Sequence, residues 1–118
     1  MSDTFGFDEF IDALGDLEED FERASIKLLE DTGDLAVAEA QMRTPVDTGT
    51  LRREMTRSDV KDLEVEVGNS VAYAEYVEDG TRYMRPRYML RDGVTVARKY
   101  FDKESEKMFE EVTKGFKL

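Results

Sequence analysis

The residues most suggestive of chemistry are Asp47, Thr48 and Gly49, the triplet that carries the catalytic carboxylate in aspartic proteases. The chain has 118 residues, which is the size of the half-enzymes whose two Asp carboxylates share one proton. In that fold the triplet follows a strongly apolar strand, whereas here it follows a helical pattern and Pro45. A retropepsin-like dimeric aspartic protease using Asp47 therefore stays only as an alternative function, because the required context is missing.

The composition removes most other catalytic groups. The chain contains no Cys and no His, which excludes a disulfide, a thiolate nucleophile, a Cys/His zinc site and a Ser-His-Asp triad. No Gly-rich phosphate-binding loop is present. We therefore expect no enzyme activity and no cofactor.

A dense run of acids lies near the N-terminus, and a cation site there is conceivable. The run lacks the spacing of oxygen ligands that an EF-hand loop has. A solvated acidic face is the favoured interpretation, and we expect no metal site. The acids are Glu9, Asp12, Asp16, Glu18, Glu19, Asp20 and Glu22.

The net charge of −11 bears on solubility and partners rather than on fold. The chain as a whole repels free DNA. Such an acid excess also suits a cell with molar internal salt, where charge repulsion is screened to within ~3 Å, and so suggests a halophilic host. No apolar run reaches membrane-spanning length, and the N-terminus lacks the basic start of a signal peptide, so we expect a protein made in the cytoplasm without a membrane partner. The length predicts a single domain, 1–118.

Residues 7–42 carry an apolar stripe that predicts one long amphipathic helix. Asp8 is its expected N-cap, and Thr32-Gly33 is expected to kink or split it, since Gly in a helix costs ~1 kcal/mol against Ala. The helix either lies on a sheet of its own domain or pairs with another subunit as a coiled coil, and a helix-mediated interaction module is thus a second alternative function. The two rows of the stripe are Phe7, Leu14, Phe21, Leu28, Leu35 and Met42, and Phe10, Leu17, Ala24 and Ala38.

A turn-rich stretch follows this helix. Pro45 stops the helix, and Gly49 is expected to take a positive φ. The side chains of Asp47 and Thr48 are expected to hydrogen-bond backbone amides in the turn. A short strand is expected to begin from Leu51 and Met55.

The middle of the chain predicts a small sheet. Residues 63–67 alternate between apolar and polar side chains, as a half-buried strand does. Gly68 is expected to serve a turn, after which residues 71–73 return as the hairpin partner.

The last third of the chain predicts a short helical turn, a loop and a second long helix. Gly80 fits the C-terminal cap of the turn, the loop surrounds Pro86, and apolar spacing from Leu90 predicts a helix to about residue 114. The predicted fold class is α+β, with a long N-terminal helix, a small antiparallel β-sheet, and a long C-terminal helix packed on the sheet.

Four segments, taken in order, resemble a family of small tailed-virus proteins, the siphovirus-type tail-completion or head-tail joining proteins. The segments are TPVDTGTLR at 44–52, VEVG at 65–68, YAEYVEDGT at 73–81 and PRYML at 86–90. The resemblance covers roughly residues 7–112. Arg85 replaces the polar residue usual before the Pro, and residues 87–89 lengthen the spacing after it, so the loop departs most from the family pattern.

The resemblance implies a non-enzymatic virion protein located at the neck, where heads join tails. It implies a homo-oligomeric ring of six or twelve copies that contacts the head connector or adaptor and the tail tube or tail terminator. DNA would pass through the lumen without sequence-specific binding. Turn and fold determinants would be Pro45, Asp47, Thr48, Gly49, Gly68 and Gly80. Tyr73, Tyr76 and Val77 would pack against the helices, and packing is favoured over partner contact for them.

A basic loop, 82–91, has four Arg and no acid. It contributes +4 to the net charge of −11, which leaves −15 on the rest of the chain. The loop can touch phosphates, dock onto an acidic face of a neighbouring identical subunit, or remain solvated. The second is favoured, because the surrounding negative field opposes DNA. Candidate subunit or connector interface residues are Arg52, Tyr76, Glu78, Thr81, Arg82, Arg85, Pro86 and Arg87.

Overall fold

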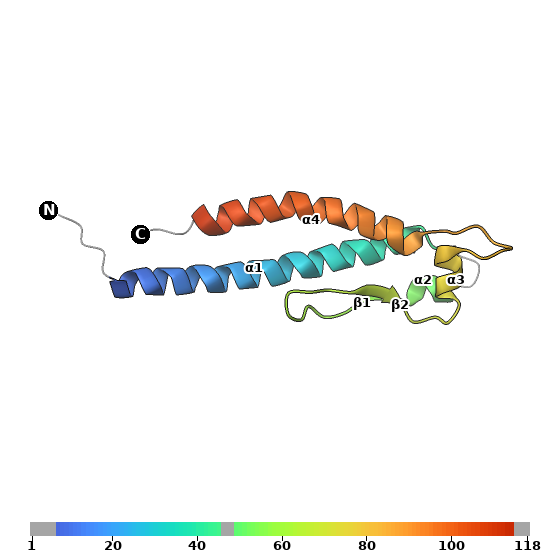
Figure 1. The fold of residues 1–118 in the computed structure, drawn as a ribbon, viewed down its shortest axis with the longest axis horizontal. Coiled ribbons are helices and arrows are strands. Elements are labelled where there is room, and N and C mark those ends of the chain that lie inside the picture. Colours follow the sequence, from blue (N-terminus) through green and yellow to red (C-terminus); the bar gives the residue numbers. More distant parts are fainter. Residues whose placement is uncertain (1–6, 46–48, 115–118) are drawn as a thin grey trace.

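The chain folds as a narrow rod in which two long helices run antiparallel (Figure 1). This computed structural model describes residues 7–45 and 49–114. The rod measures 78 × 21 × 21 Å, and its radius of gyration is 20.5 Å, against ~13–14 Å for a compact domain of this length. Its elements are α1 (Phe7–Met42), α2 (Thr50–Arg53), β1 (Met55–Arg57), β2 (Val67–Asn69), α3 (Ala74–Asp79) and α4 (Met89–Lys114).

The first long helix, α1, is a single helix of 36 residues. Asp8 lies inside its first turn, so the predicted N-cap position is wrong. The helix is also not split at Thr32-Gly33. The Thr32 hydroxyl donates to the carbonyl of Leu28 at 2.7 Å, which satisfies the hydroxyl within the helix. Gly33 instead lets a neighbouring segment approach, since a Cβ there would lie 2.6 Å from Cδ of Arg57.

Small residues bring α4 close to α1. Gly93 of α4 is buried, and a Cβ on it would lie 2.8 Å from the backbone N of Ala40 and 3.0 Å from the carbonyl oxygen of Ala36. Ala97, one turn further along α4, is also buried. Both long helices, the short helix α3 and the α+β class are confirmed, whereas Leu51, where a strand was predicted to begin, lies in the short helix α2. α4 packs along α1, and the sheet packs on α1 rather than on α4 (Figure 1).

The sheet has two antiparallel strands, β1 and β2, and its pairing differs from the prediction. Thr56 lies opposite Gly68, which is therefore a strand residue and not a turn residue. The alternating segment 63–67 reaches β2 only at its end, and residues 71–73 lead into α3 instead of forming a strand. The loop between the strands turns through Asp62 and Leu63, whose φ values are 53° and 57°.

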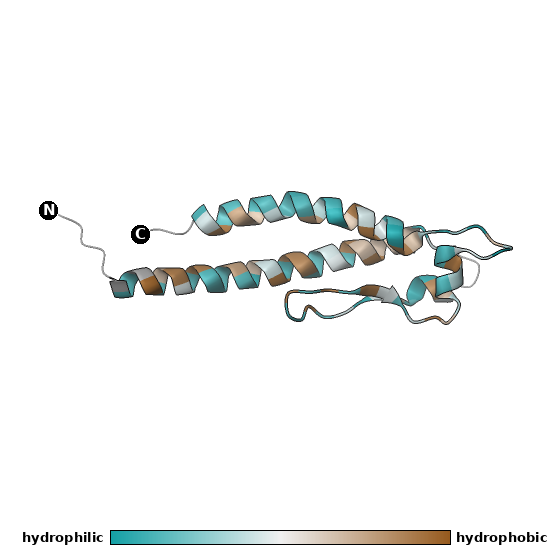
Figure 2. Cartoon of the chain, in the orientation of Figure 1, coloured by the Kyte–Doolittle hydropathy of each residue, from teal (hydrophilic) through white to brown (hydrophobic). Residues whose placement is uncertain are grey.

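The hydrophobic core lies at the end of the rod that carries the sheet and α3. Its central cluster is Ala40, Leu51, Met55, Ala74 and Met89. Figure 2 shows that apolar residues nevertheless recur along α1 as far as its N-terminal end. Neither α1 nor α4, nor any shorter helix in 7–45 and 49–114, is apolar over a long enough stretch to cross a membrane.

Candidate assembly surfaces

The segment that follows α1 is fixed by hydrogen bonds from buried and half-buried side chains. The Thr44 hydroxyl donates to the carbonyl of Ala40 at 2.6 Å and contacts Sδ of Met89 at 3.5 Å. Arg52 donates through Nε to the carbonyl of Gln41 at 3.0 Å, and its guanidinium also reaches the carbonyl of Thr44 at 3.4 Å. Arg52 thus stabilises the carbonyl end of α1, where a positive charge is favourable, and serves the fold.

The predicted turn is described only in part. Pro45 directly follows buried Thr44. Gly49 has φ 70°, as predicted, in the left-handed region that glycine adopts without strain, and it is the N-cap of α2. Asp47 and Thr48 lie outside the described residues.

The Asn69 side chain joins the segment before α3 to Leu51 of α2, a contact that was not predicted from the sequence. Asn69 donates through Nδ2 to the carbonyl of Leu51 at 2.6 Å and accepts from the amide of Val71 at 2.9 Å. Ala74 is the buried residue of α3, whereas Tyr76 is 59% exposed, so the predicted packing of that ring against the helices is wrong. The one sequence signal for the Asn69 contacts is an Asn beside Ser70, since Asn side chains often hydrogen-bond the backbone two residues further on.

Glu78 caps the long helix α4. Its two carboxylate oxygens accept hydrogen bonds from the amides of Leu90 at 2.8 Å and Arg91 at 2.9 Å. The carbonyl of Glu78 also accepts from the amide of Tyr88 at 3.1 Å. A negative charge at a helix N-terminus satisfies free amides and the helix dipole together. The sequence spacing does not predict this contact, because the partners are twelve positions apart in the chain.

The loop between α3 and α4 projects from the rod (Figure 1). Its basic side chains are exposed. Its base is narrow, since Gly80 has φ 78° and a Cβ there would lie 2.7 Å from N of Pro86. Its end is a tight turn in which the amide of Thr81 donates to the carbonyl of Met84 at 2.9 Å. We call residues 81–87 the tip loop. Its exposed members include Arg82, Tyr83, Arg85, Pro86 and Arg87.

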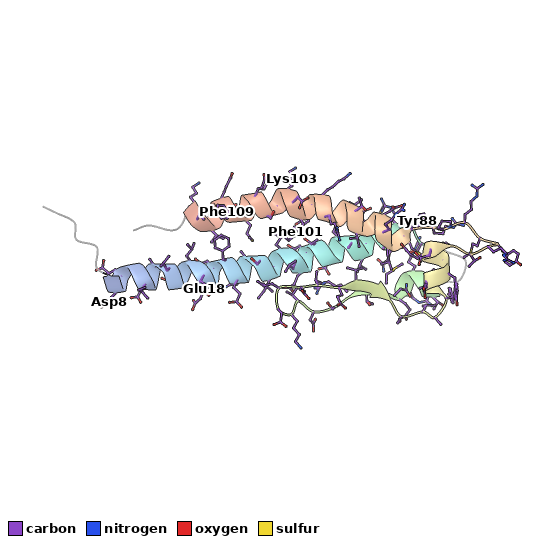
Figure 3. All side chains as sticks on the ribbon, in the orientation of Figure 1. Asp8, Glu18, Tyr88, Phe101, Lys103 and Phe109 are labelled. Atoms are coloured by element: carbon purple, nitrogen blue, oxygen red, sulfur yellow. The ribbon has the colours of Figure 1, made fainter. Side chains whose placement is uncertain are left out.

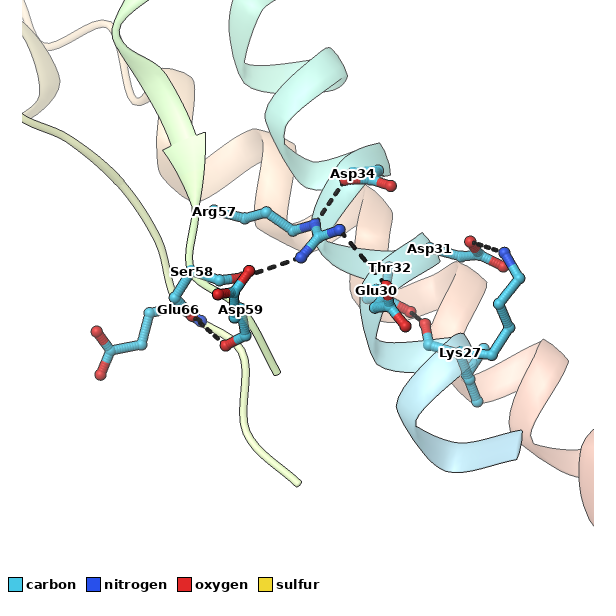
Figure 4. A network of polar contacts seen from close by, with 10 residues as sticks. Lys27, Glu30, Asp31, Thr32, Asp34, Arg57, Ser58, Asp59 and Glu66 are labelled. Carbon is cyan, nitrogen blue, oxygen red and sulfur yellow. Dashed lines mark hydrogen bonds and ion pairs between the residues drawn. The ribbon is translucent and has the colours of Figure 1, made fainter. Parts of the chain in front are cut away.

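Ion pairs tie the sheet to the middle of α1 (Figure 4). Arg57 of β1 contacts Asp34 at 2.6 Å and Glu30 at 3.9 Å. The hydrogen bond that Arg57 donates to Asp34 raises the pKa of the Arg57 guanidinium. Lys27, one turn before Asp31 on the same helix, pairs with that carboxylate at 2.7 Å, and this hydrogen bond raises the pKa of Lys27. The Arg57 pairs fix the position of the sheet on α1, whereas the Lys27–Asp31 pair lies within the helix.

The opposite end of the rod is acidic. Asp8 and Glu18 mark this region of α1 in Figure 3, and Tyr88 marks the base of the tip loop at the other end. No group of three or more acids in the described ranges is placed to hold a metal ion. Guanidinium groups at one end and carboxylates at the other can form charged contacts with other macromolecules.

Residues 8–80 match the family model described as "Bacteriophage HK97-gp10, putative tail-component". The chain belongs to this family. The HK97-gp10-like match spans α1 through α3 and ends at Gly80, so the tip loop and α4 lie beyond it, although the resemblance was expected to reach residue 112. No curated protein and no solved structure matches the chain.

Proposed function

We propose that this HK97-gp10-like protein is a non-enzymatic structural protein of the neck of a tailed virus. Several copies form a ring that joins the head connector to the tail and lets DNA pass through its lumen. The observation that carries the proposal is the family match over 8–80, which identifies the chain with a bacteriophage tail component. The resemblance of the ordered motifs at 44–52, 65–68 and 73–81 to head-tail joining proteins supports the finer position at the neck.

The shape and the surfaces support a role in assembly. A rod of 78 Å with a small core at one end has a large area available for contact with neighbours. The net charge of −11 repels duplex DNA, which favours passage through a lumen over binding. A ring needs only repeated contacts between copies.

The two alternative functions receive less support. α1 precedes residues 46–48 and α2 follows them, so the apolar strand that a protease triplet requires is not the neighbouring structure. The apolar stripe of α1 is used largely within the chain, since the Phe21 ring contacts Phe109 of α4 with centroids 5.6 Å apart and Leu28 is buried. A coiled coil through that stripe would have to displace α4.

Deletion of the gene from the virus, followed by electron microscopy of lysates, tests the proposal. We expect DNA-filled heads and complete tails that fail to join, and restoration of joined particles by the wild-type chain supplied from a plasmid. Labelled protein should locate at the neck. Normal numbers of infectious particles from the deletion virus would contradict the neck role.

A further inference from the structure

The acidic end of the rod leaves part of the α1 apolar face uncovered. α1 has 36 residues and α4 has 26, and the two helices meet at the other end through Thr44 and Met89. The ten additional residues of α1 therefore project about 15 Å past the described end of α4, at 1.5 Å per residue. Ile11 and Leu14 on this projection keep 48% and 39% of their surface exposed.

These exposed residues form a continuous apolar strip with the helix seam. At 100° per residue, Ile11, Leu14 and Phe21 lie within about 80° of one another on α1. Phe21 contacts Phe109, whose ring is itself 57% exposed (Figure 3). We call Ile11, Leu14 and Phe109 the distal strip. A partner that covers it removes apolar surface from water.

The surroundings of the distal strip define the charge of that partner. Every acid between residues 8 and 22 is exposed, and this segment of α1 contains no Lys or Arg. A partner must therefore bring positive charge together with apolar contact area. An acidic partner would meet like-charge repulsion.

The tip loop has those properties. Arg82, Arg85 and Arg87 are exposed on it, and Tyr83 at its turn is 89% exposed, with Met84 beside it at 40%. Tyr and Arg are the side chains most often found at the centre of protein interfaces. The tip loop lies at the opposite end of the 78 Å rod from the distal strip, so the two surfaces of one chain cannot meet (Figure 1).

We propose that the tip loop of one copy docks on the distal strip of a second copy of this chain. The contact is head-to-tail, since each copy offers a different surface to each of its two neighbours, and such contacts close into a ring when the rotation allows. The inference rests on the proposed ring and names its two surfaces. The contact also offsets the mutual repulsion of chains that each carry −11.

A charge exchange tests the pairing. Variant A carries Arg82→Glu and Arg85→Glu, and variant B carries Glu18→Lys and Glu22→Lys, since at 100° per residue these two exposed acids lie beside Ile11 on the face of the distal strip. Each variant reverses two charges on one of the two surfaces, which weakens the attraction between tip loop and distal strip in A or B alone. In a mixture, the unchanged tip loop of B can dock on the unchanged distal strip of A, and the reversed residues of A and B carry opposite charges. We expect self-association of A or B alone to be at least about tenfold weaker than that of the wild type, and the equimolar mixture to recover it. Sedimentation velocity at ~0.1 M and ~1 M salt measures the effect, which should shrink as screening increases.

Matched controls carry the same changes of charge elsewhere. Arg98→Glu with Lys99→Glu on α4 matches variant A, and Glu64→Lys with Glu66→Lys in the strand-connecting loop matches variant B; all four side chains are exposed. Both controls should associate as the wild type does. Circular dichroism confirms that every variant is helical.

A photo-crosslinking amino acid at Tyr83 locates the contact in solution and in virus particles. Cross-links to residues 8–22 or to Phe109 of a second copy are expected. Cross-links to DNA or to another virion protein would overturn the proposal. So would wild-type-like association of A and B alone, or failure of the mixture to recover association. A wild-type chain that is monomeric in solution and not cross-linked to itself in particles would overturn it as well. Particles that assemble with A or B alone would refute this pairing and leave the neck role standing, whereas a harmless gene deletion would refute the neck role and leave the pairing testable in solution.

Discussion

Removal of the Glu78 carboxylate should destabilise the fold at the junction between the tip loop and α4. The Glu78→Ala substitution deletes acceptors for two backbone amides, those of Leu90 and Arg91, at 2.8 and 2.9 Å. Leu90 is partly buried against the core cluster, so water replaces the lost acceptor poorly at that amide. The change also removes a negative charge from the N-terminus of a 26-residue helix.

The magnitude follows from these contacts. Loss of a capping side chain costs about 0.5–2 kcal/mol, and a carboxylate at a helix N-terminus contributes about 0.3–1 kcal/mol. Glu78 is half-buried, which places the combined loss near 2 kcal/mol for Glu78→Ala. Glu78→Gln keeps one acceptor oxygen and should cost about 1 kcal/mol.

Urea unfolding followed by circular dichroism measures the difference. With an m-value of about 1.5 kcal/mol/M, the midpoint should fall by about 1.3 M for Glu78→Ala and by half of that for Glu78→Gln. Glu75→Ala is the matched control, because Glu75 is exposed on the same short helix. A Glu78→Ala midpoint within 0.3 M of the wild type, or an equal loss in the control, would refute the capping role; these limits are about a quarter of the predicted shift.

Three further predictions test the packing and the turn. Gly93→Ala should cost about 2 kcal/mol because its Cβ meets Ala40 backbone, whereas Gly15→Ala, with nothing within 4 Å, should stabilise by about 0.5–1 kcal/mol; equal shifts in thermal unfolding would disprove the close helix contact. Asn69→Ala removes two hydrogen bonds and should lower the melting temperature by about 4–8 °C, unlike exposed Ser70→Ala. Asp47→Asn should leave particle assembly intact and cost at most ~1 kcal/mol, and loss of a proteolytic activity in that variant would restore the protease hypothesis.

The sequence predicted both long helices because their burial follows the helical period. The predicted ranges, 7–42 and 90–114, differ from the observed ones by one residue at the start of α4. What periodicity could not show is which helix face meets which partner. The decisive contacts involve Gly33 and Gly93, which let a neighbouring segment approach closely because they have no side chain. A hydrophobicity pattern does not reveal such contacts, since it records only the side chains that are present.

The small sheet was harder to predict because its pairing depends on distant residues. The alternation at 63–67 favoured a local hairpin with residues 71–73, but β2 pairs with the earlier strand β1, with Met55 opposite Asn69 and Arg57 opposite Val67. The charge pattern of the sequence predicted one part of the candidate surface, the Arg side chains of the tip loop. The role of Glu78 was not visible, since it depends on a helix terminus that the fold brings beside it.

Because the buried residues are distributed unevenly along the rod, its two ends should unfold with different free energies. All hydrophobic residues that are buried in the described chain lie between Leu28 and Ala97, so residues 11–27 of α1 contribute little to the core. Amide hydrogen exchange along α1 should therefore be graded, slow near Ala40 and fast near Ile11, rather than limited by one global opening. A neighbouring copy bound at that end would slow this exchange, and part of the binding free energy would then be consumed in ordering the helix.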